Sequence, residues 1–262
     1  MIEHYIPSLS TYSSDVDQLV WLVTILVGFW FVAAEVMFFW LIWRFRARAG
    51  VAAQYVTGKE KRLKRWINVP HTLILVCDVL IIVAAIRVWY KVKQTLPPAD
   101  ETVRVISQQW TWTFQQPGPD GRLDTPDDIF SADTLHVPVN RTVHFQLESK
   151  DVLHSFFVPV FRLKQDAVPG RVITGWFRAT RTGVHDIRCS QICGVAHGIM
   201  SAEIEIQSQE QHAAWMRSHA GTPIGAFHAG AGGAAPAPAG TTTADAPRAA
   251  LAAAAAAADT RN

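Results

Sequence analysis

Cysteine is scarce in this sequence, with three residues in a chain of 262. A disulfide-rich scaffold is therefore excluded, and the lack of a Cys-x-x-Cys-His pattern excludes a c-type haem attachment site. A strong excess of one charge is also missing, because 24 Lys and Arg residues face 22 Asp and Glu residues. The composition gives no general charge argument for binding nucleic acid. Since 49% of the residues are hydrophobic, the chain is not an intrinsically disordered protein either.

Two long apolar runs in the first third of the chain predict a membrane hairpin. The first covers residues 19–43 and contains one ionisable side chain, Glu35. The second covers residues 67–90 and is interrupted by Asp78 and Arg87. About 20 apolar residues cross the hydrocarbon core as a helix, so both runs are long enough. A cleaved signal peptide is the alternative for the first run, but its apolar stretch would be shorter and a basic segment would precede it.

The charges around the two runs indicate how the hairpin is oriented. The connecting loop, residues 44–66, contains eight Lys and Arg residues and one Glu. Basic loops of this kind stay in the cytoplasm. Both termini and everything after residue 90 are therefore expected on the outer face of the membrane. Glu35 and Asp78 are costly in lipid and are expected to contact a larger membrane subunit, with proton transfer as the alternative role.

The sequence divides into three parts. Residues 1–98 hold the N-terminal arm and the hairpin, residues 99–217 an outer domain, and residues 218–262 a low-complexity tail. The tail consists mainly of Ala, Gly, Pro and Thr, and we expect it to be disordered. The outer domain contains short stretches in which apolar and polar residues alternate, and these predict an all-β sandwich or small barrel. The stretches are residues 102–107, 110–115, 141–149, 172–179 and 201–207.

One segment of the outer domain is rich in side chains that bind metals. Residues 189–200 read C-S-Q-I-C-G-V-A-H-G-I-M and hold two thiols, an imidazole and a thioether. A second imidazole, His154, lies upstream at the end of a predicted strand. Thiolate, thioether and imidazole ligands favour copper, whereas structural zinc sites are built from Cys, His and carboxylate ligands and do not use a thioether. The alternative is a disulfide between Cys189 and Cys193 in an oxidising compartment.

Four motifs together resemble cytochrome c oxidase subunit II. The 189–200 segment is similar to that family's pattern C-S-E-x-C-G-x-x-H-x-x-M, which forms a dinuclear copper centre called CuA. Residues 151–155 (D-V-L-H-S), 163–171 (L-K-Q-D-A-V-P-G-R) and 109–112 (Q-W-T-W) match three further elements. With the hairpin, the similarity covers residues 15–217 in unchanged order. The fold class that it implies is a two-helix transmembrane hairpin followed by a cupredoxin-like Greek-key sandwich.

The resemblance also implies a set of copper ligands. Two thiolates would bridge two copper ions, each imidazole would bind one ion, and a thioether and a backbone carbonyl would complete the centre. These ligands are Cys189 and Cys193, His154 and His197, Met200, and Gln191 through its carbonyl oxygen. The family usually has Glu in place of Gln191, and that carboxylate reaches a magnesium ion at the interface with subunit I. A neutral amide is a poorer ligand for a hard cation, which weakens the expectation of magnesium here.

Electron transfer is the function that the resemblance implies. The chain would take electrons from cytochrome c, or an equivalent donor, and pass them through CuA to the haem of subunit I. Trp110 matches the exposed tryptophan through which the family takes up electrons, so donor docking is expected near Trp110 and Asp151. The complete complex, in which subunit III is a further expected partner, is an oxidoreductase and translocase that reduces oxygen and pumps protons. The isolated chain would be an electron carrier.

The sequence also predicts roles for several other residues. Seven acids between residues 100 and 133 are a candidate docking face for a basic donor, with a plain solvated loop as the alternative. Trp112 is expected in the core. The basic side chains expected to face the partner subunit are Arg162, Lys164 and Arg171.

Three other classes of protein share parts of this pattern. A copper-delivery or thiol assembly factor of the Sco type also pairs C-x-x-x-C with a distant His, but it has one span and a thioredoxin-like α/β domain. Quinol oxidase subunit II shares the scaffold without the copper ligands. CuA also occurs in nitrous oxide reductases and in some nitric oxide reductases, so the motifs identify the copper centre more sharply than the terminal electron acceptor.

Overall fold

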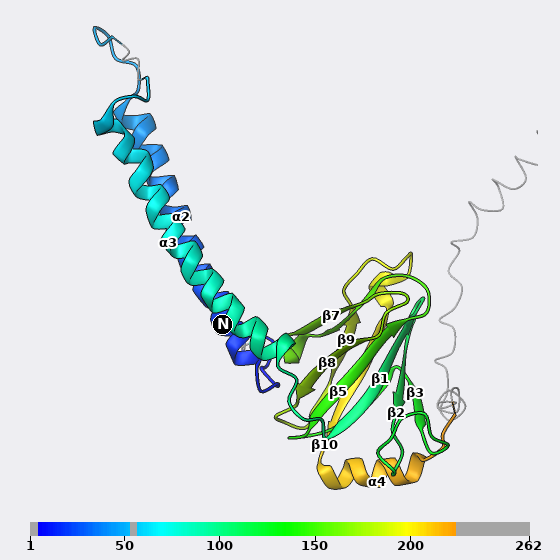
Figure 1. Ribbon diagram of the computed structural model, residues 1–262. Coiled ribbons are helices and arrows are strands. Elements are labelled where there is room, and N and C mark those ends of the chain that lie inside the picture. The colour runs from blue at the N-terminus through cyan, green and yellow to red at the C-terminus, as the bar shows by residue number, and fades with distance from the viewer. Residues whose placement is uncertain (1–4, 53–56, 224–262) are drawn as a thin grey trace, which may run out of the picture. The chain divides into compact units, whose positions relative to one another are not determined.

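The computed structural model describes residues 5–52 and 57–223 (Figure 1). Residues 1–4, 53–56 and 224–262 lie outside the described residues, and they include most of the predicted tail. Within the described ranges the chain forms two long apolar helices, a β-sandwich and a C-terminal helix. This arrangement confirms the predicted fold class.

Two apolar helices contain the predicted membrane spans. Helix α2 covers Ser13–Arg44 and helix α3 covers Lys61–Trp89, followed by a π-helical turn, η1, at Tyr90–Gln94. Both helices are long and apolar enough to cross a bilayer. Large apolar side chains are exposed all round them, as expected of helices that are surrounded by lipid or by other membrane helices. The two helices contact each other, and Trp30 Nε1 donates a hydrogen bond to Cys77 Sγ at 3.5 Å.

The outer domain is a sandwich of two five-stranded sheets (Figure 1). One sheet has the strand order β3-β2-β1-β5-β8, and the other has the order β4-β10-β9-β6-β7. The pairs β1–β5 and β4–β10 are parallel and the other pairs are antiparallel. The strands are β1 (Glu101–Gln108), β2 (Thr111–Gln116), β3 (Ile129–Ala132), β4 (Thr134–Pro138), β5 (Thr142–Ser149), β6 (His154–Val158), β7 (Leu163–Ala167), β8 (Ile173–Arg178), β9 (Gly183–Cys189) and β10 (Ser201–Gln207).

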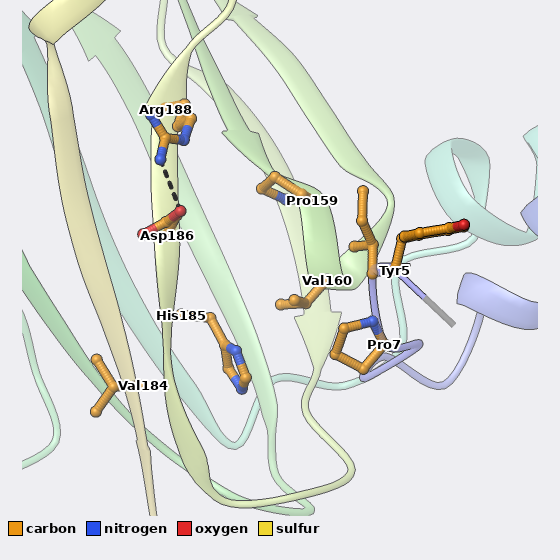
Figure 2. Close-up of a pocket in the computed structure, with 9 residues that line it drawn as sticks. Tyr5, Pro7, Pro159, Val160, Val184, His185, Asp186 and Arg188 are labelled. Carbon is orange, nitrogen blue, oxygen red and sulfur yellow. Dashed lines mark hydrogen bonds and ion pairs between the residues drawn. The ribbon is translucent and has the colours of Figure 1, made fainter. Parts of the chain in front are cut away.

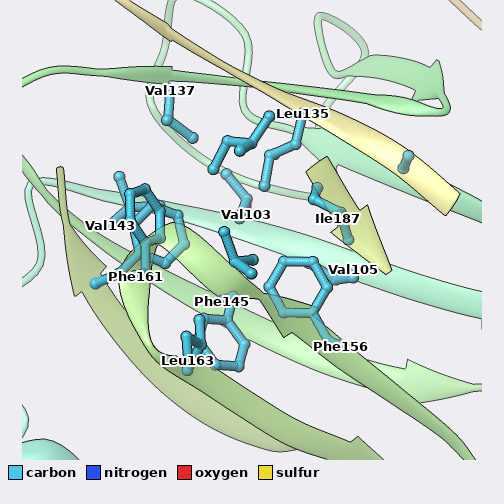
Figure 3. Close-up of a cluster of buried hydrophobic side chains, with 14 of the residues drawn as sticks. Val103, Val105, Leu135, Val137, Val143, Phe145, Phe156, Phe161, Leu163 and Ile187 are labelled. Carbon is cyan, nitrogen blue, oxygen red and sulfur yellow. The ribbon is translucent and has the colours of Figure 1, made fainter. Parts of the chain in front are cut away.

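Apolar side chains of the two sheets fill the space between them (Figure 3). Val103 and Val105 of β1 lie in this core with Phe145 of β5, and Phe156 of β6 meets them from the other sheet. The ring centroids of Phe145 and Phe156 are 5.6 Å apart. Fully burying a Phe side chain contributes about 1.5–3 kcal/mol to folding. Because the core is closely packed, the strand ends that lead into the loops are held in fixed positions.

The segment before α2 packs into the sandwich, which the sequence did not indicate. Leu9 and Tyr12 are buried in the core, and Ser10 forms a β-bridge with Ala179, just after β8. The Tyr12 hydroxyl donates a hydrogen bond to the carbonyl oxygen of Trp176 at 3.2 Å. The beginning of the first membrane helix is therefore attached directly to the outer domain.

The C-terminal helix α4, Gln209–His219, packs on β4 and β10. It begins with a capping box, in which Ser208 and Gln211 each accept a hydrogen bond from the other's backbone N–H. The ring of Trp215 stacks on His136 of β4 with 4.1 Å between centroids. This contact buries His136 under the helix.

Candidate metal centre

Two segments at one end of the sandwich bring the predicted ligands together, the start of β6 and the loop from β9 to β10. His154 begins β6, Cys189 ends β9, and Cys193 follows in the loop that leads to the short 3-10 helix η3, His197–Ile199. Met200 lies between η3 and β10. The ligand atoms of His154, Cys189 and Cys193 all lie within 4.8 Å of one another. These three residues form a group that could hold a metal ion.

The side chains of this cluster are close but not bonded to each other. The two sulfur atoms are 3.8 Å apart and both cysteines are free, whereas a disulfide bond is about 2.05 Å long. Cys189 Sγ lies 3.9 Å from His154 Nδ1, and Cys193 Sγ lies 3.7 Å from His197 Nδ1. Cys193 Sγ is also 3.7 Å from Met200 Sδ. The alternative of a Cys189–Cys193 disulfide is therefore not what the structure contains.

His154 has the orientation that a metal ligand needs. Its side chain is fully buried, and its Nε2 lies 2.8 Å from Asp151 Oδ1. A carboxylate accepts hydrogen bonds, so the ring proton resides on Nε2 in this arrangement. The other ring nitrogen, Nδ1, faces Cys189 Sγ and keeps its lone pair for a metal.

Burial makes the Cys193 thiol a poor anion unless a cation accompanies it. Burial, together with the neighbouring Cys189, raises the pKa of Cys193 to about 11. Two thiolates side by side in this buried place would be costly without a compensating positive charge. A metal ion supplies that charge, and the donor set of two thiols, two imidazoles and a thioether fits copper better than a hard cation.

Glycine is required at one position of the loop that carries the predicted ligands, residues 189–200. Gly194 has a φ of +131°, which residues with a side chain rarely adopt. A Cβ atom there would lie 2.9 Å from Gln109 Nε2 and 3.0 Å from the ring of Trp110. The loop is closed by a backbone hydrogen bond from Cys189 N to Met200 O at 3.1 Å. The loop and the turn that carries Trp110 therefore pack directly against each other.

A polar network that was not predicted from the sequence joins this turn to the predicted ligands. Gln109 Nε2 donates a hydrogen bond to the Cys193 carbonyl oxygen at 2.6 Å, and Gln109 N donates to Asp151 Oδ2 at 2.7 Å. Since Asp151 Oδ1 faces His154, one carboxylate connects both elements. Burial opposes ionisation of Asp151, but these hydrogen bonds outweigh it and hold its pKa below the usual range. The spacing D-x-x-H in the D-V-L-H-S motif was the available signal.

The two tryptophans of the Q-W-T-W motif have different environments. Trp110 lies in the turn between β1 and β2 and is 38% exposed. Trp112 is fully buried in β2, and its ring lies 5.7 Å from Phe156 and 6.3 Å from His154. Trp112 is a core residue, as expected, and Trp110 is the one of the pair that a partner can reach.

The acidic residues do not form one docking face beside Trp110. Asp124 forms two hydrogen bonds with Arg104, at 2.8 and 3.0 Å. Arg104 is four residues from the end of β1, which places this pair about 13 Å along the strand from the turn, at about 3.3 Å per residue. Asp133 does lie at the Trp110 end, where it accepts a hydrogen bond from Thr111 at 3.3 Å. The other five acids lie at or before the start of β1 or beside the β2–β3 loop: Asp100, Glu101, Asp120, Asp127 and Asp128.

Exposed apolar side chains lie on the loop of residues 189–200 instead. Ile192, Val195 and Ile199 are between 80 and 97% exposed. Single apolar residues in a loop carry no periodic pattern, so the sequence did not single them out. Exposed apolar side chains that gather in one place are typical of an interaction surface.

Gln191 is positioned through both its backbone and its side chain. Its carbonyl oxygen lies 3.3 Å from Cys189 Sγ, within the ligand cluster. Its side-chain Nε2 donates a hydrogen bond to Asp166 Oδ2 at 3.3 Å. The amide of Gln191 is thus hydrogen-bonded to the carboxylate of Asp166 in β7. A Glu at position 191 would place a second carboxylate beside Asp166.

One of the three basic residues predicted to face a partner subunit forms an ion pair within this chain. Arg162 is largely buried and paired with Asp17 of α2, because the segment before α2 packs against the sandwich at this point. Lys164 and Arg171 are exposed.

Comparisons with known proteins give a consistent result. Residues 128–207 match the family described as cytochrome c oxidase subunit II, periplasmic domain. The chain is 34% identical over 214 residues to an alternative cytochrome c oxidase subunit 2 of Bradyrhizobium diazoefficiens, covering 73% of this chain and 75% of the relative. It is 29% identical over 245 residues to a cytochrome c oxidase subunit 2 of Cereibacter sphaeroides, covering 82% and 79%. The crystal structure of the periplasmic domain of subunit II of a Bradyrhizobium japonicum cytochrome oxidase aligns with a TM-score of 0.43 and 28% identity, over 48% of this chain and 96% of that one.

Proposed function

Because this chain belongs to the cytochrome c oxidase subunit II family, we propose that it is the electron-transfer subunit of a terminal respiratory oxidase. It would accept electrons from a reduced cytochrome c and pass them to the haem of subunit I, where oxygen reduction is coupled to proton pumping. The observation that carries this proposal is the convergence of two thiols with the imidazole of His154 in one buried cluster. Membership of the family adds subunit I as the partner.

Six residues would hold the two copper ions of a CuA centre. They are the side chains of Cys189, Cys193, His154, His197 and Met200 and the carbonyl oxygen of Gln191. When bound, the copper ions supply a centre that accepts and releases one electron at a time. The protein supplies thiolates that offset the metal charge and a buried site from which water is excluded.

The surroundings of the ligands favour fast electron transfer because they resist movement. His154 and Cys189 lie at strand ends fixed by the core, and Asp151 fixes the ring of His154. Gly194 allows the loop to lie directly on the turn of Trp110. A site held by packed neighbours and by hydrogen bonds changes little when its charge changes, so little energy is spent on reorganisation.

Trp110 is the proposed place of electron uptake. Its neighbour Gln109 donates a hydrogen bond to the Cys193 carbonyl, so a short path of bonds joins the exposed turn to a ligand. The exposed side chains of Ile192, Val195 and Ile199 beside the same loop favour apolar contact with the donor. Asp151 remains part of this region, but its carboxylate already serves the turn and His154.

The two apolar helices and the basic loop between them support the proposed membrane topology. The spans would cross a bacterial inner membrane, with the basic loop in the cytoplasm and the metal domain in the periplasm. A Sco-type copper-delivery factor would need a thioredoxin-like α/β domain, and residues 101–207 form a β-sandwich instead. The observed fold therefore argues against a Sco-type factor.

Copper analysis of the full-length chain in detergent tests this proposal. We expect two copper ions per chain and an electron paramagnetic resonance signal from one unpaired electron shared by two copper nuclei. Cys189→Ser should lose this signal, whereas Cys77→Ser, which changes a cysteine in the hairpin, should keep it. A single copper ion, or a metal-free dithiol after exposure to copper, would contradict the proposed centre.

A further inference from the structure

Arg162 has an unusual backbone conformation at a junction of the fold. It follows the short 3-10 helix η2, Pro159–Phe161, and precedes β7. Its φ is +55°, in the left-handed region that costs free energy for a residue with a side chain. A bulky residue in this conformation calls for an explanation in its side-chain contacts.

The guanidinium of Arg162 binds the beginning of the first membrane helix. Nε and Nη2 donate hydrogen bonds to the two carboxylate oxygens of Asp17, at 2.7 and 3.0 Å. The remaining donors reach backbone carbonyls: Nη1 donates to Pro159 at 2.8 Å and to Pro7 at 3.4 Å, and Nη2 donates to Ile6 at 2.9 Å. Asp17 is only 7% exposed. This two-pronged ion pair has the geometry in which arginine is strongest and most specific.

The backbone around this ion pair is joined across the same junction. Leu9 N donates a hydrogen bond to Val160 O at 2.8 Å, and Thr180 N donates to Leu9 O at 2.9 Å. Figure 2 shows Tyr5 and Pro7 of the N-terminal segment beside Pro159 and Val160. The N-terminal segment is therefore held on the sandwich by backbone hydrogen bonds as well as by the side chain of Arg162.

The second membrane helix is tied to the same region. Lys91, in the turn after α3, forms an ion pair with Asp15 of α2 at 2.5 Å. Lys93, two residues on, donates a hydrogen bond to Gln165 of β7 at 2.7 Å. Both membrane helices thus meet the outer domain at the β6–β7 hairpin and the segment packed against it.

The β6–β7 hairpin also carries a ligand of the metal centre. His154 begins β6 and pairs with Ala167 at the end of β7, while Arg162 lies at the opposite end, between the two strands. One rigid hairpin therefore has the membrane junction at one end and the metal centre at the other. The hairpin therefore links the position of the whole metal centre to the place where the domain sits on the membrane helices.

We propose that Arg162 is a positioning residue for electron transfer out of the metal centre. Its ion pair with Asp17 fixes the outer domain on the membrane hairpin, and so fixes the distance from the centre to the acceptor in the partner subunit. Electron transfer between fixed sites slows steeply as their separation grows. This inference rests on the proposed function, since it assumes a redox centre and an acceptor in the membrane.

Two variants in the intact oxidase complex test the inference. Arg162→Gly removes the guanidinium while keeping a residue that suits a φ of +55°, and Asp17→Asn removes the charge of its partner. We expect both to slow electron transfer from the reduced metal centre to the haem by about 10- to 100-fold, because small displacements of reacting groups have effects of this size. The copper signal and electron uptake from cytochrome c should stay unchanged. Lys91→Ala, which breaks a more exposed ion pair, is the control and should change the rate less than about twofold.

Amide hydrogen exchange of the full chain gives a readout that needs no copper. In Arg162→Gly the amides of Leu9 and Thr180 should exchange faster, while amides of the central strands β1 and β5 keep their protection. Unchanged exchange, or faster exchange with an unchanged transfer rate, would overturn the positioning role. Slower transfer with these amides still protected would overturn it too. A wild-type chain without the copper signal would instead count against the proposed function, and the exchange result would still report on the junction.

Discussion

Replacing Asp151 with Asn tests whether this residue acts through the metal centre or through the donor. Asp151 Oδ1 accepts hydrogen bonds from His154 at 2.8 Å and from Val152 N at 2.6 Å, and Oδ2 accepts one from Gln109 N at 2.7 Å. Asparagine offers one oxygen and one NH₂ group. In either orientation of the amide, an N–H of the protein faces a donor instead of an acceptor.

The expected loss follows from the contacts that the carboxylate makes. Hydrogen bonds to a charged group are each worth about 1.5–3 kcal/mol. Removing a carboxylate that orients a metal-binding histidine commonly weakens metal binding about 10- to 100-fold, or about 1.4–2.7 kcal/mol. We therefore expect Asp151→Asn to lower the affinity for copper by this factor. His154 is fully buried, so water cannot easily replace the missing partner.

Titration of the full-length chain with copper against a competing chelator measures this effect. Asp133→Asn is the matched control, because Asp133 carries the same charge at the Trp110 end but accepts its side-chain hydrogen bond from Thr111. If Asp151 serves only to attract the donor, both variants should slow electron uptake to a similar extent and leave copper affinity unchanged. That result would refute the role assigned to its hydrogen bonds.

Three further predictions follow from burial and exposure. Trp112→Ala should lower the free energy of unfolding by about 3–5 kcal/mol in chemical denaturation, because a fully buried ring is removed; a loss below about 1 kcal/mol would mean that the site tolerates the cavity. Trp110→Ala should slow electron uptake from cytochrome c and leave the absorption of the copper centre intact, whereas a bleached centre would show that Trp110 is structural. Burial lowers the pKa of His136 to about 4, although Glu205 opposes this effect. As the pH falls from about 6.5 to 4, His136 is therefore protonated in the unfolded chain before it is protonated in the folded protein. The free energy of unfolding falls by at most about 3 kcal/mol across this range. In urea denaturation, His136→Gln should lack this part of the pH dependence, and parallel curves for the two proteins would contradict it.

The fold could be predicted from the sequence because its main signals are local. Apolar runs of membrane length and alternating strands need only the residues of one segment to be recognised. The pairing of strands is not local: β1 lies parallel to β5, and β4 lies parallel to β10. The register of a hairpin also decides positions: β2 sets Gln115 opposite Arg104, so Asp124 of the following loop lies at Arg104 and not beside Trp110. The acids between residues 100 and 133 are therefore spread over several places in the fold, and their role as a docking face for a basic donor stays a prediction.

The ligand cluster could be predicted for a related reason. Four of its side chains fall within residues 189–200, because ligands of one metal centre on one loop must have a fixed spacing. The attachment of the N-terminal segment could not be predicted, because Leu9 and Tyr12 lie in a short segment without helical or strand periodicity. Only the packed sandwich shows that they complete its core.

The contacts that fix the centre in space are encoded differently from its ligands. Gln109 and Cys193 are 84 residues apart, and Asp17 and Arg162 are 145 residues apart. No spacing rule applies to such pairs, because each joins two segments that meet only in the folded protein. An electron-transfer centre depends on both kinds of residue: ligands decide that it binds metal, and the distant pairs decide how far it lies from donor and acceptor. Substitutions at Gln109, Arg162 or Asp17 should therefore change transfer rates in a chain whose copper-binding motif is intact.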